Sequence, residues 1–152
     1  MAFEMTEQVR RHLTDDTLVW LTTVSPKGRP APRLVWFMWT GAGAVRREPG
    51  THPGLTETEC LIYSQPEAAK LRHIAQNDRV TLNFNSNNLG GDAVVLAGRG
   101  TLAPDAPAPE ALPGLLEKYA DLLEAIDMSA EHFTSTYTVA LRVTLDGAWT
   151  IT

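Results

Sequence analysis

Short runs of β-branched and aromatic residues recur along this chain between clusters of Gly, Pro, Asn and Asp. Such runs predict strands separated by turns. The predicted strands cover residues 17–24, 29–39, 59–64, 80–85, 93–102, 137–145 and 148–151. Apolar residues at helical spacing predict helices over 4–13 and 113–126, a shorter helical turn over 129–134 capped by Ser129, and a helix between the strands at 59–64 and 80–85.

Several strands carry local signals. Prolines at positions 30 and 32 predict that the strand over 29–39 pairs firmly only from Arg33 onward. Residues 34–39 are nearly all apolar, so we expect both faces of this segment to be covered, one by the barrel interior and the other by a neighbouring subunit or a cofactor. Gly98 and Gly100 indicate a bulge or close backbone approach, and Asp146-Gly147 predicts a type I′ hairpin.

The order of these elements predicts a mainly β protein, an antiparallel barrel of six or seven strands with added helices. The same pattern also fits an open α+β sheet, and the residues alone leave both open. With 152 residues the chain is expected to form a single domain over 1–152.

Composition removes several classes of function. A net charge of −5 argues against nucleic acid as the main partner. With no leader and no apolar run near ~18 residues, we expect no membrane span and a cytoplasmic protein. Cys60, the single cysteine, is predicted to be a buried, inert thiol. The four histidines show no spacing for a metal site, and the chain has no hydrolase elbow or P-loop. No catalytic residue is evident.

The helix after residue 64 carries the best candidate chemistry. Ser64 is predicted as its N-cap, with Pro66 in the first turn and Glu67 three residues after the cap. The free N–H groups of such a helix start, with Lys70 and Arg72 close by, would form an anion site suited to phosphate. The alternative is that Lys70 and Arg72 form the solvated face of an amphipathic helix.

Residues 63–84, with Lys70 and Asn77-Asp78-Arg79-Val80 at matching spacing, resemble the pyridoxamine 5′-phosphate oxidase-like, FMN-binding split barrels. The resemblance extends loosely from about residue 14 to 152. Within that superfamily, three segments look most like the actinobacterial branch that uses the deazaflavin coenzyme F420. They are Leu-Thr-Thr-Val-Ser-Pro-Lys-Gly-Arg-Pro, Val-Trp-Phe-Met-Trp and Ile-Tyr-Ser-Gln-Pro.

The resemblance implies a split barrel that forms a homodimer with the cofactor at the subunit interface. It implies Lys70 as the main phosphate ligand, helped by Ser64 and Arg72, and Arg33 as a further cofactor contact. Two positions depart from the oxidases, since Ala69 and Met38 stand where they carry Arg and Lys. These departures weaken the expectation of firm FMN binding.

Other residues are candidates with open alternatives. Trp36 and Met38 are candidate walls against the cofactor ring, or else plain barrel core or dimer interface. Asn83 and Asn85 would meet the polar edge of the cofactor, or else are surface amides. The segment over residues 40–58 is a long loop, either a lid or substrate-reading element or a functionally idle insertion. Four loop cations are candidates for the acidic tail of F420: Lys27, Arg29, Arg46 and Arg47.

These features predict an oxidoreductase that uses F420 to transfer a hydride to or from a small unsaturated or redox-active molecule. Missing catalytic motifs fit this function, because the coenzyme ring carries the hydride while the protein anchors and orients it. The alternatives are an FMN-dependent enzyme of the same fold, and a non-catalytic carrier of deazaflavin, FMN or haem.

Overall fold

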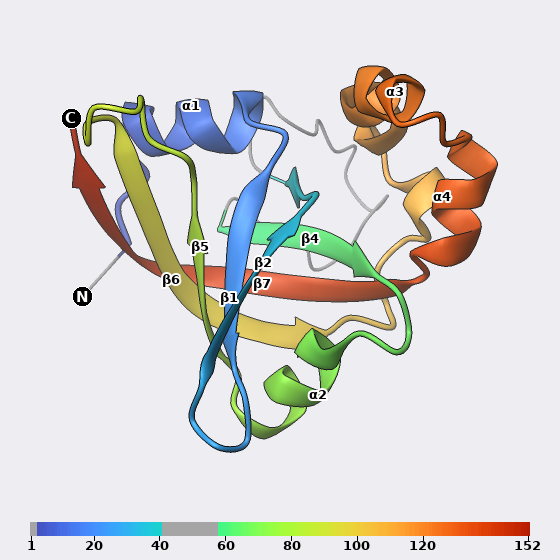
Figure 1. The fold of residues 1–152 in the computed structure, drawn as a ribbon, viewed down its shortest axis with the longest axis horizontal. Helices are drawn as coiled ribbons and strands as arrows, with labels where there is room; N and C mark the ends of the chain where they lie inside the picture. The colour runs from blue at the N-terminus through green and yellow to red at the C-terminus, as the bar shows by residue number, and fades with distance from the viewer. Residues whose placement is uncertain (1–2, 41–57) are drawn as a thin grey trace.

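A computed structural model describes residues 3–40 and 58–152 of the chain. The loop expected over residues 40–58, with the tail candidates Arg46 and Arg47, lies almost wholly outside the described residues. The described part forms one antiparallel sheet with helices at its ends and over its opening (Figure 1).

The sheet has seven strands in the order β2-β1-β5-β6-β7-β4-β3, and all pairings are antiparallel. The strands are β1 (Val19–Val24), β2 (Pro30–Val35), β3 (Met38–Trp39), β4 (Glu59–Ser64), β5 (Arg79–Asn83), β6 (Ala93–Leu102) and β7 (Val139–Ile151). The helices are α1 (Glu7–Asp15), α2 (Ala69–Gln76), the 3-10 turn η1 (Pro109–Ala111), α3 (Leu115–Ala125) and α4 (Ala130–Thr136). None of the described helices has the length and apolar character needed to cross a membrane.

Strands β2 and β3 form opposite edges of the sheet, yet only Trp36 and Phe37 separate them in the chain. The sheet must therefore curl until its two edges approach. This is the mainly β split barrel that the family resemblance implies, so the open-sheet alternative is wrong. The apolar segment 34–39 is accordingly divided between two edge strands. Its coverage is uneven, because Met38 and Trp39 are buried while Leu34 is 46% exposed.

The prolines of β2 do not delay its pairing, which starts with Val24 opposite Pro30 and continues to Val19 opposite Val35. The prediction of pairing only from Arg33 is therefore wrong. The reason is that β2 pairs on one side only, so each proline can direct its missing N–H away from β1.

The predicted hairpin at Asp146-Gly147 is also wrong, because β7 runs without a break through both residues. Gly147 pairs with Ala97 whereas Leu145 pairs with Gly98, so Asp146 is the extra residue of a bulge. The signal from Gly98 and Gly100 is confirmed. A Cβ on Gly98 would collide with the backbone carbonyl of Thr144, and one on Gly100 would press against the side chain of Ile74 in α2.

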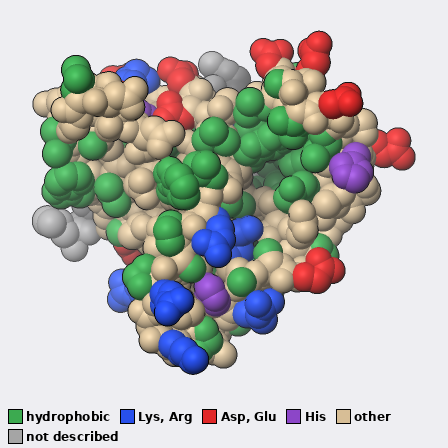
Figure 2. Space-filling model, viewed as in Figure 1, with side chains coloured by type: hydrophobic (Ala, Val, Ile, Leu, Met, Phe, Trp, Pro, Cys, Tyr) green, Lys and Arg blue, Asp and Glu red, His purple; other side chains and the backbone are tan. Residues whose placement is uncertain are grey.

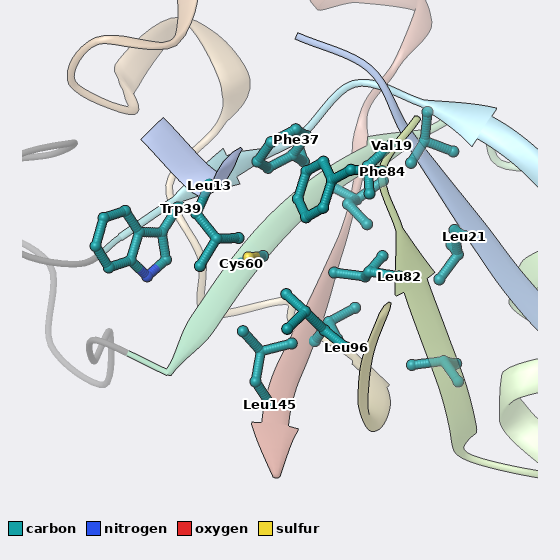
Figure 3. Close-up of a cluster of buried hydrophobic side chains, with 14 of the residues drawn as sticks. Leu13, Val19, Leu21, Phe37, Trp39, Cys60, Leu82, Phe84, Leu96 and Leu145 are labelled. Carbon is teal, nitrogen blue, oxygen red and sulfur yellow. The ribbon is translucent and has the colours of Figure 1, made fainter. Parts of the chain in front are cut away.

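Two groups of buried side chains fill the molecule. The larger lies inside the barrel and draws residues from α1 and most strands, as Figure 3 shows for Leu13, Phe37, Cys60 and Leu96. Burial raises the pKa of the Cys60 thiol to about 12, which agrees with an inert cysteine. The smaller group packs α3 and α4 against the outer side of β3 and β4, through residues including Met38, Leu61, Tyr119 and Phe133.

A cluster of paired charges fastens α1 to the turn before β6. Both ring nitrogens of buried His12 meet carboxylates, with Nδ1 2.7 Å from Asp16 and Nε2 3.0 Å from Asp92. Arg11 donates to the same Asp92 oxygen at 2.7 Å. Burial alone would lower the pKa of His12, but the hydrogen bonds to Asp16 and Asp92 outweigh it and raise the pKa.

Candidate functional site

Two adjoining hollows open between the edge strand β2, the end of β4, helix α2 and the α3–α4 segment. Leu34, Lys70 and Tyr137 line both of them. Figure 2 shows a depression walled by hydrophobic side chains on this face, with Lys and Arg side chains gathered below it over the β1–β2 hairpin and α2. We name the two spaces the aromatic hollow and the cation hollow.

The cation hollow, of about 380 Å³, brings Lys70 of α2 to face Arg33 of β2. Burial lowers the pKa of the Lys70 ammonium, and the positive charge of Arg33 lowers it further. Arg33 is exposed, and its guanidinium donates to the carbonyl of Pro32 at 2.8 Å. Among the described residues neither cation has a carboxylate partner, so the hollow carries unbalanced positive charge.

Helix α2 begins at the wall of this hollow. Ala68, its N-cap, and Ala69 both line the space, and no side chain caps the helix. The first N–H groups and the positive end of the helix dipole therefore lie beside Lys70. The prediction of Ser64 as N-cap is wrong, because Ser64 is buried as the last residue of β4 and its hydroxyl donates to the carbonyl of Gln65 at 3.0 Å.

The aromatic hollow encloses about 330 Å³. Its remaining walls are Val35, Trp36, Tyr63, Ile126, Met128 and Phe133. Apart from Lys70, the ionisable groups on these walls are tyrosine hydroxyls. The Tyr63 hydroxyl donates to the carbonyl of Pro107 at 2.6 Å, and burial raises its pKa. The walls are mostly apolar and aromatic side chains, which suit a flat ring.

The rings of Tyr119 and Phe133 hold the Trp36 side chain in place. Its indole stacks on the ring of Tyr119 with centroids 4.4 Å apart and planes 4° from parallel, and Phe133 tilts against it at 5.2 Å. The Tyr119 hydroxyl accepts from the N–H of Phe37 at 2.7 Å and lies 2.8 Å from the carbonyl of Phe37 and 3.0 Å from that of Thr17. Tyr119 thus fixes the backbone between β2 and β3 and, with it, the orientation of Trp36.

Lys118 completes this support. Its ammonium lies 3.7 Å above the ring of Phe37 and donates to the Phe37 carbonyl at 3.0 Å. Burial lowers the pKa of Lys118 to about 8. Because the carbonyl and the ring of Phe37 both attract the charged ammonium, Lys118 helps to hold the connection between β2 and β3 that carries Trp36.

The structure brings together only part of the predicted set. Lys70 and Arg33 meet in the cation hollow, and Trp36 lines the aromatic hollow next to them. Met38 is buried among the residues between α3 and β4 and lines neither hollow. Arg72 is exposed on α2, where it donates to the carbonyl of Glu67 at 3.1 Å, and also lies outside both.

The two candidate asparagines also lie away from the hollows. Asn83 pairs with Trp20 and Val95 in the middle of the sheet. Asn85 accepts from the indole N–H of Trp20 at 3.2 Å, which is the contact of a surface amide.

Several lining residues were missed as site residues in the sequence, and those with polar or aromatic side chains include Tyr63, His73, Phe133 and Tyr137. Phe133 and Tyr137 are four residues apart across α4, and their rings lie 5.3 Å from each other. That spacing was a usable signal for an aromatic face. His73 follows Lys70 by three residues and so shares its side of α2. Among the described residues no group of three His, Cys, Asp or Glu side chains is placed to hold a metal ion.

Solved structures support the fold, although all those compared are distant in sequence. A conserved protein from Mycobacterium tuberculosis has a TM-score of 0.64 at 14% identity, covering 98% of this chain and 87% of its own. An FAD-binding protein from Mesorhizobium loti has a TM-score of 0.58 at 15% identity, with 95% and 92% covered. The haem storage protein HutZ from Vibrio cholerae has a TM-score of 0.56 at 12% identity, with 99% and 96% covered.

No curated protein matches the chain at a significant level. The family model for pyridoxamine 5′-phosphate oxidase, in contrast, matches residues 5–151, nearly the whole chain. With the curled seven-stranded sheet, this match identifies the chain as a member of the pyridoxamine 5′-phosphate oxidase family.

Proposed function

We propose that this protein is a cytoplasmic, homodimeric oxidoreductase that binds coenzyme F420 and acts on a small unsaturated or redox-active molecule. The observation that carries the proposal is the position of Lys70, which lines a cationic space and an aromatic space at once. A coenzyme with a phosphate near a flat ring system needs a cationic space and an aromatic space side by side.

The residues of the two hollows fit such a coenzyme. Lys70 and Arg33 would bind the phosphate, since both are cations without a carboxylate partner in the described part of the chain. Trp36, fixed by Tyr119, would pack against the ring, while Phe133 and Tyr137 would keep water from it. When bound, the deazaflavin supplies hydride transfer. The protein supplies the anchoring, the orientation and the dry surroundings.

The choice of F420 over FMN is supported by the departures from the oxidases. Ala69 lines the cation hollow without offering a charge, and Met38 is buried in apolar surroundings. A phosphate monoester such as that of FMN carries close to two negative charges at neutral pH, so it depends more on those missing cations. FMN is the second candidate coenzyme, and family membership supports it directly.

A carrier without activity is the alternative from another class. The described walls of the aromatic hollow include no carboxylate or histidine that could move a proton, and the haem storage protein HutZ shares the fold. Turnover separates the two functions. A carrier of deazaflavin, FMN or haem binds its ligand in fixed ratio, but does not reoxidise reduced F420 in the presence of any acceptor.

The proposed dimer is supported by a row of side chains on the outer face of the sheet. Leu34, Trp20, Asn83, Val95 and Trp149 lie opposite one another in register across five neighbouring strands. Leu34 is 46% and Trp149 59% exposed, and a row that is apolar except for Asn83 suits contact with a second copy. Because Leu34 also lines both hollows, that contact would adjoin the coenzyme.

Titration with F420 and with FMN, each followed by fluorescence, tests the proposal. We expect F420 to bind more tightly, and Lys70→Ala to weaken its binding by about tenfold or more, because a charge-assisted contact is lost. Arg72→Ala is the matched control, with the same charge removed from the same helix outside the hollows. Tighter binding of FMN would make the oxidase-like alternative correct, and binding of neither would refute the proposal.

Sedimentation of the same samples measures the mass of the protein in solution and so tests the dimer. A species of 16.6 kDa, the mass of one chain, would contradict it.

A further inference from the structure

We propose that His73 is a third phosphate ligand in the cation hollow, donating from Nε2 beside Lys70 and Arg33. This inference rests on the proposed function of the same site. It assigns a specific task to a residue that neither the helix signature nor the family resemblance singles out.

The placement of His73 supports this role. It lines the cation hollow with Lys70, three residues earlier on α2, and with Arg33 from β2. The hydroxyl of Thr23 on β1 lies 2.8 Å from its Nδ1. Thr23 is buried, 1% exposed, so the ring is held from the interior side. No described residue lies within hydrogen-bond distance of Nε2, which leaves that nitrogen available to a ligand.

Thr23 is a suitable holder because a hydroxyl both donates and accepts. With neutral imidazole it donates to Nδ1, and the ring proton then sits on Nε2. With imidazolium it accepts from Nδ1–H, and Nε2 still carries a proton. In both states His73 can therefore donate one hydrogen bond to a phosphate oxygen, and only in the second does it add a positive charge.

Among the described residues, no carboxylate lines the cation hollow beside His73. The other titratable groups lining the hollow are Lys70, Arg33 and Tyr137. Strand β6 faces α2 at Gly100, which bears no charge. Since no carboxylate competes for the imidazolium among the described residues, an anionic ligand is its natural partner. His73 thereby takes over part of the task that the Arg missing at position 69 performs in the oxidases.

The experiment measures the affinity for F420 at one fixed pH in the wild type, in His73→Gln and in His73→Ala. We expect His73→Ala to lose about fivefold to tenfold in affinity, because a hydrogen bond to the phosphate is lost. His73→Gln keeps a neutral donor, and we expect it to retain more of the affinity than His73→Ala.

The exposed His132 on α4 provides the matched control, and His132→Ala should keep the wild-type affinity. A wild-type affinity in His73→Ala, with binding still dependent on Lys70, would overturn this inference and leave the proposed function standing. NMR with inorganic phosphate gives a readout independent of the coenzyme. The imidazole signals of His73 should shift while those of His132 stay, and no shift of the His73 signals would refute its contact with phosphate.

Discussion

Two clusters of basic side chains, at different places in this molecule, differ in what surrounds them. In the cluster that fastens α1, Arg11 and His12 both contact Asp92, and His12 also contacts Asp16. In the cation hollow, Arg33 and Lys70 face each other, and the described residues offer them no carboxylate. The first arrangement stabilises the fold. The second leaves charge unbalanced, which costs stability unless an anionic ligand binds.

The largest effect on stability is expected for His12→Ala, which tests whether the paired cluster stabilises the fold. The substitution removes both carboxylate contacts of a buried ring that also stacks on Phe84 at 5.1 Å. We expect the free energy of unfolding, measured with urea, to fall by about 2–4 kcal/mol. His132→Ala, at an exposed histidine, should change it by less than about 0.5 kcal/mol. A small effect of His12→Ala would mean that the paired cluster is not structural.

The second test uses pH. Because the folded protein raises the pKa of His12, its contribution to stability is complete below about pH 6.5, the ordinary pKa of histidine, and is lost as pH rises through the raised value. The pKa of Asp92 is lowered, mainly by its hydrogen bond to Arg11, so its contribution is lost only as strong acid protonates the carboxylate. Urea unfolding of the wild type between pH 6 and pH 9 should show the loss, smaller than that of His12→Ala. A flat profile would contradict the assignment to His12.

The smallest effect is expected for the stability of Lys70→Gln. Removing a partly buried ammonium that faces Arg33 relieves like-charge repulsion, so the free energy of unfolding should stay within about 0.5 kcal/mol or rise slightly. Arg72→Gln on the same helix gives the control. If Lys70→Gln lowered the free energy of unfolding as much as His12→Ala, the cation hollow would stabilise the fold. It would then not differ from the cluster at α1.

The sequence predicts the fold well wherever local pattern and tertiary packing agree. The alternating residues 93–102 form β6 with the predicted bounds, and Ser129 caps α4 by accepting from the N–H of His132. Asp146-Gly147 misleads because the same dipeptide suits a hairpin or a bulge, and pairing with β6 decides between them. Ser64 misleads because α2 begins only at Ala69, after the N-cap Ala68, so that Ser64 belongs to the strand alone.

The site was harder to predict because its walls come from distant parts of the chain. Lys70 was proposed from its place near a helix start and from the resemblance, Arg33 from the resemblance alone, and Trp36 from its apolar strand. Tyr137 reaches the hollows only because α3 and α4 fold back over the end of β4, which no local pattern encodes. His73 depends on its contact with Thr23, a residue 50 positions earlier.

The position of β7 in the sheet has a consequence for how this protein is made. The last strand in the described part of the chain lies between β6 and β4, and among the described strands it alone joins β3 and β4 to the other four. A growing chain that has reached residue 138 can therefore contain one four-stranded and one two-stranded piece, each with an open edge. The barrel and both hollows are completed only once β7 has been synthesised. The chain thus exposes strand edges during most of its translation, when chaperones matter most.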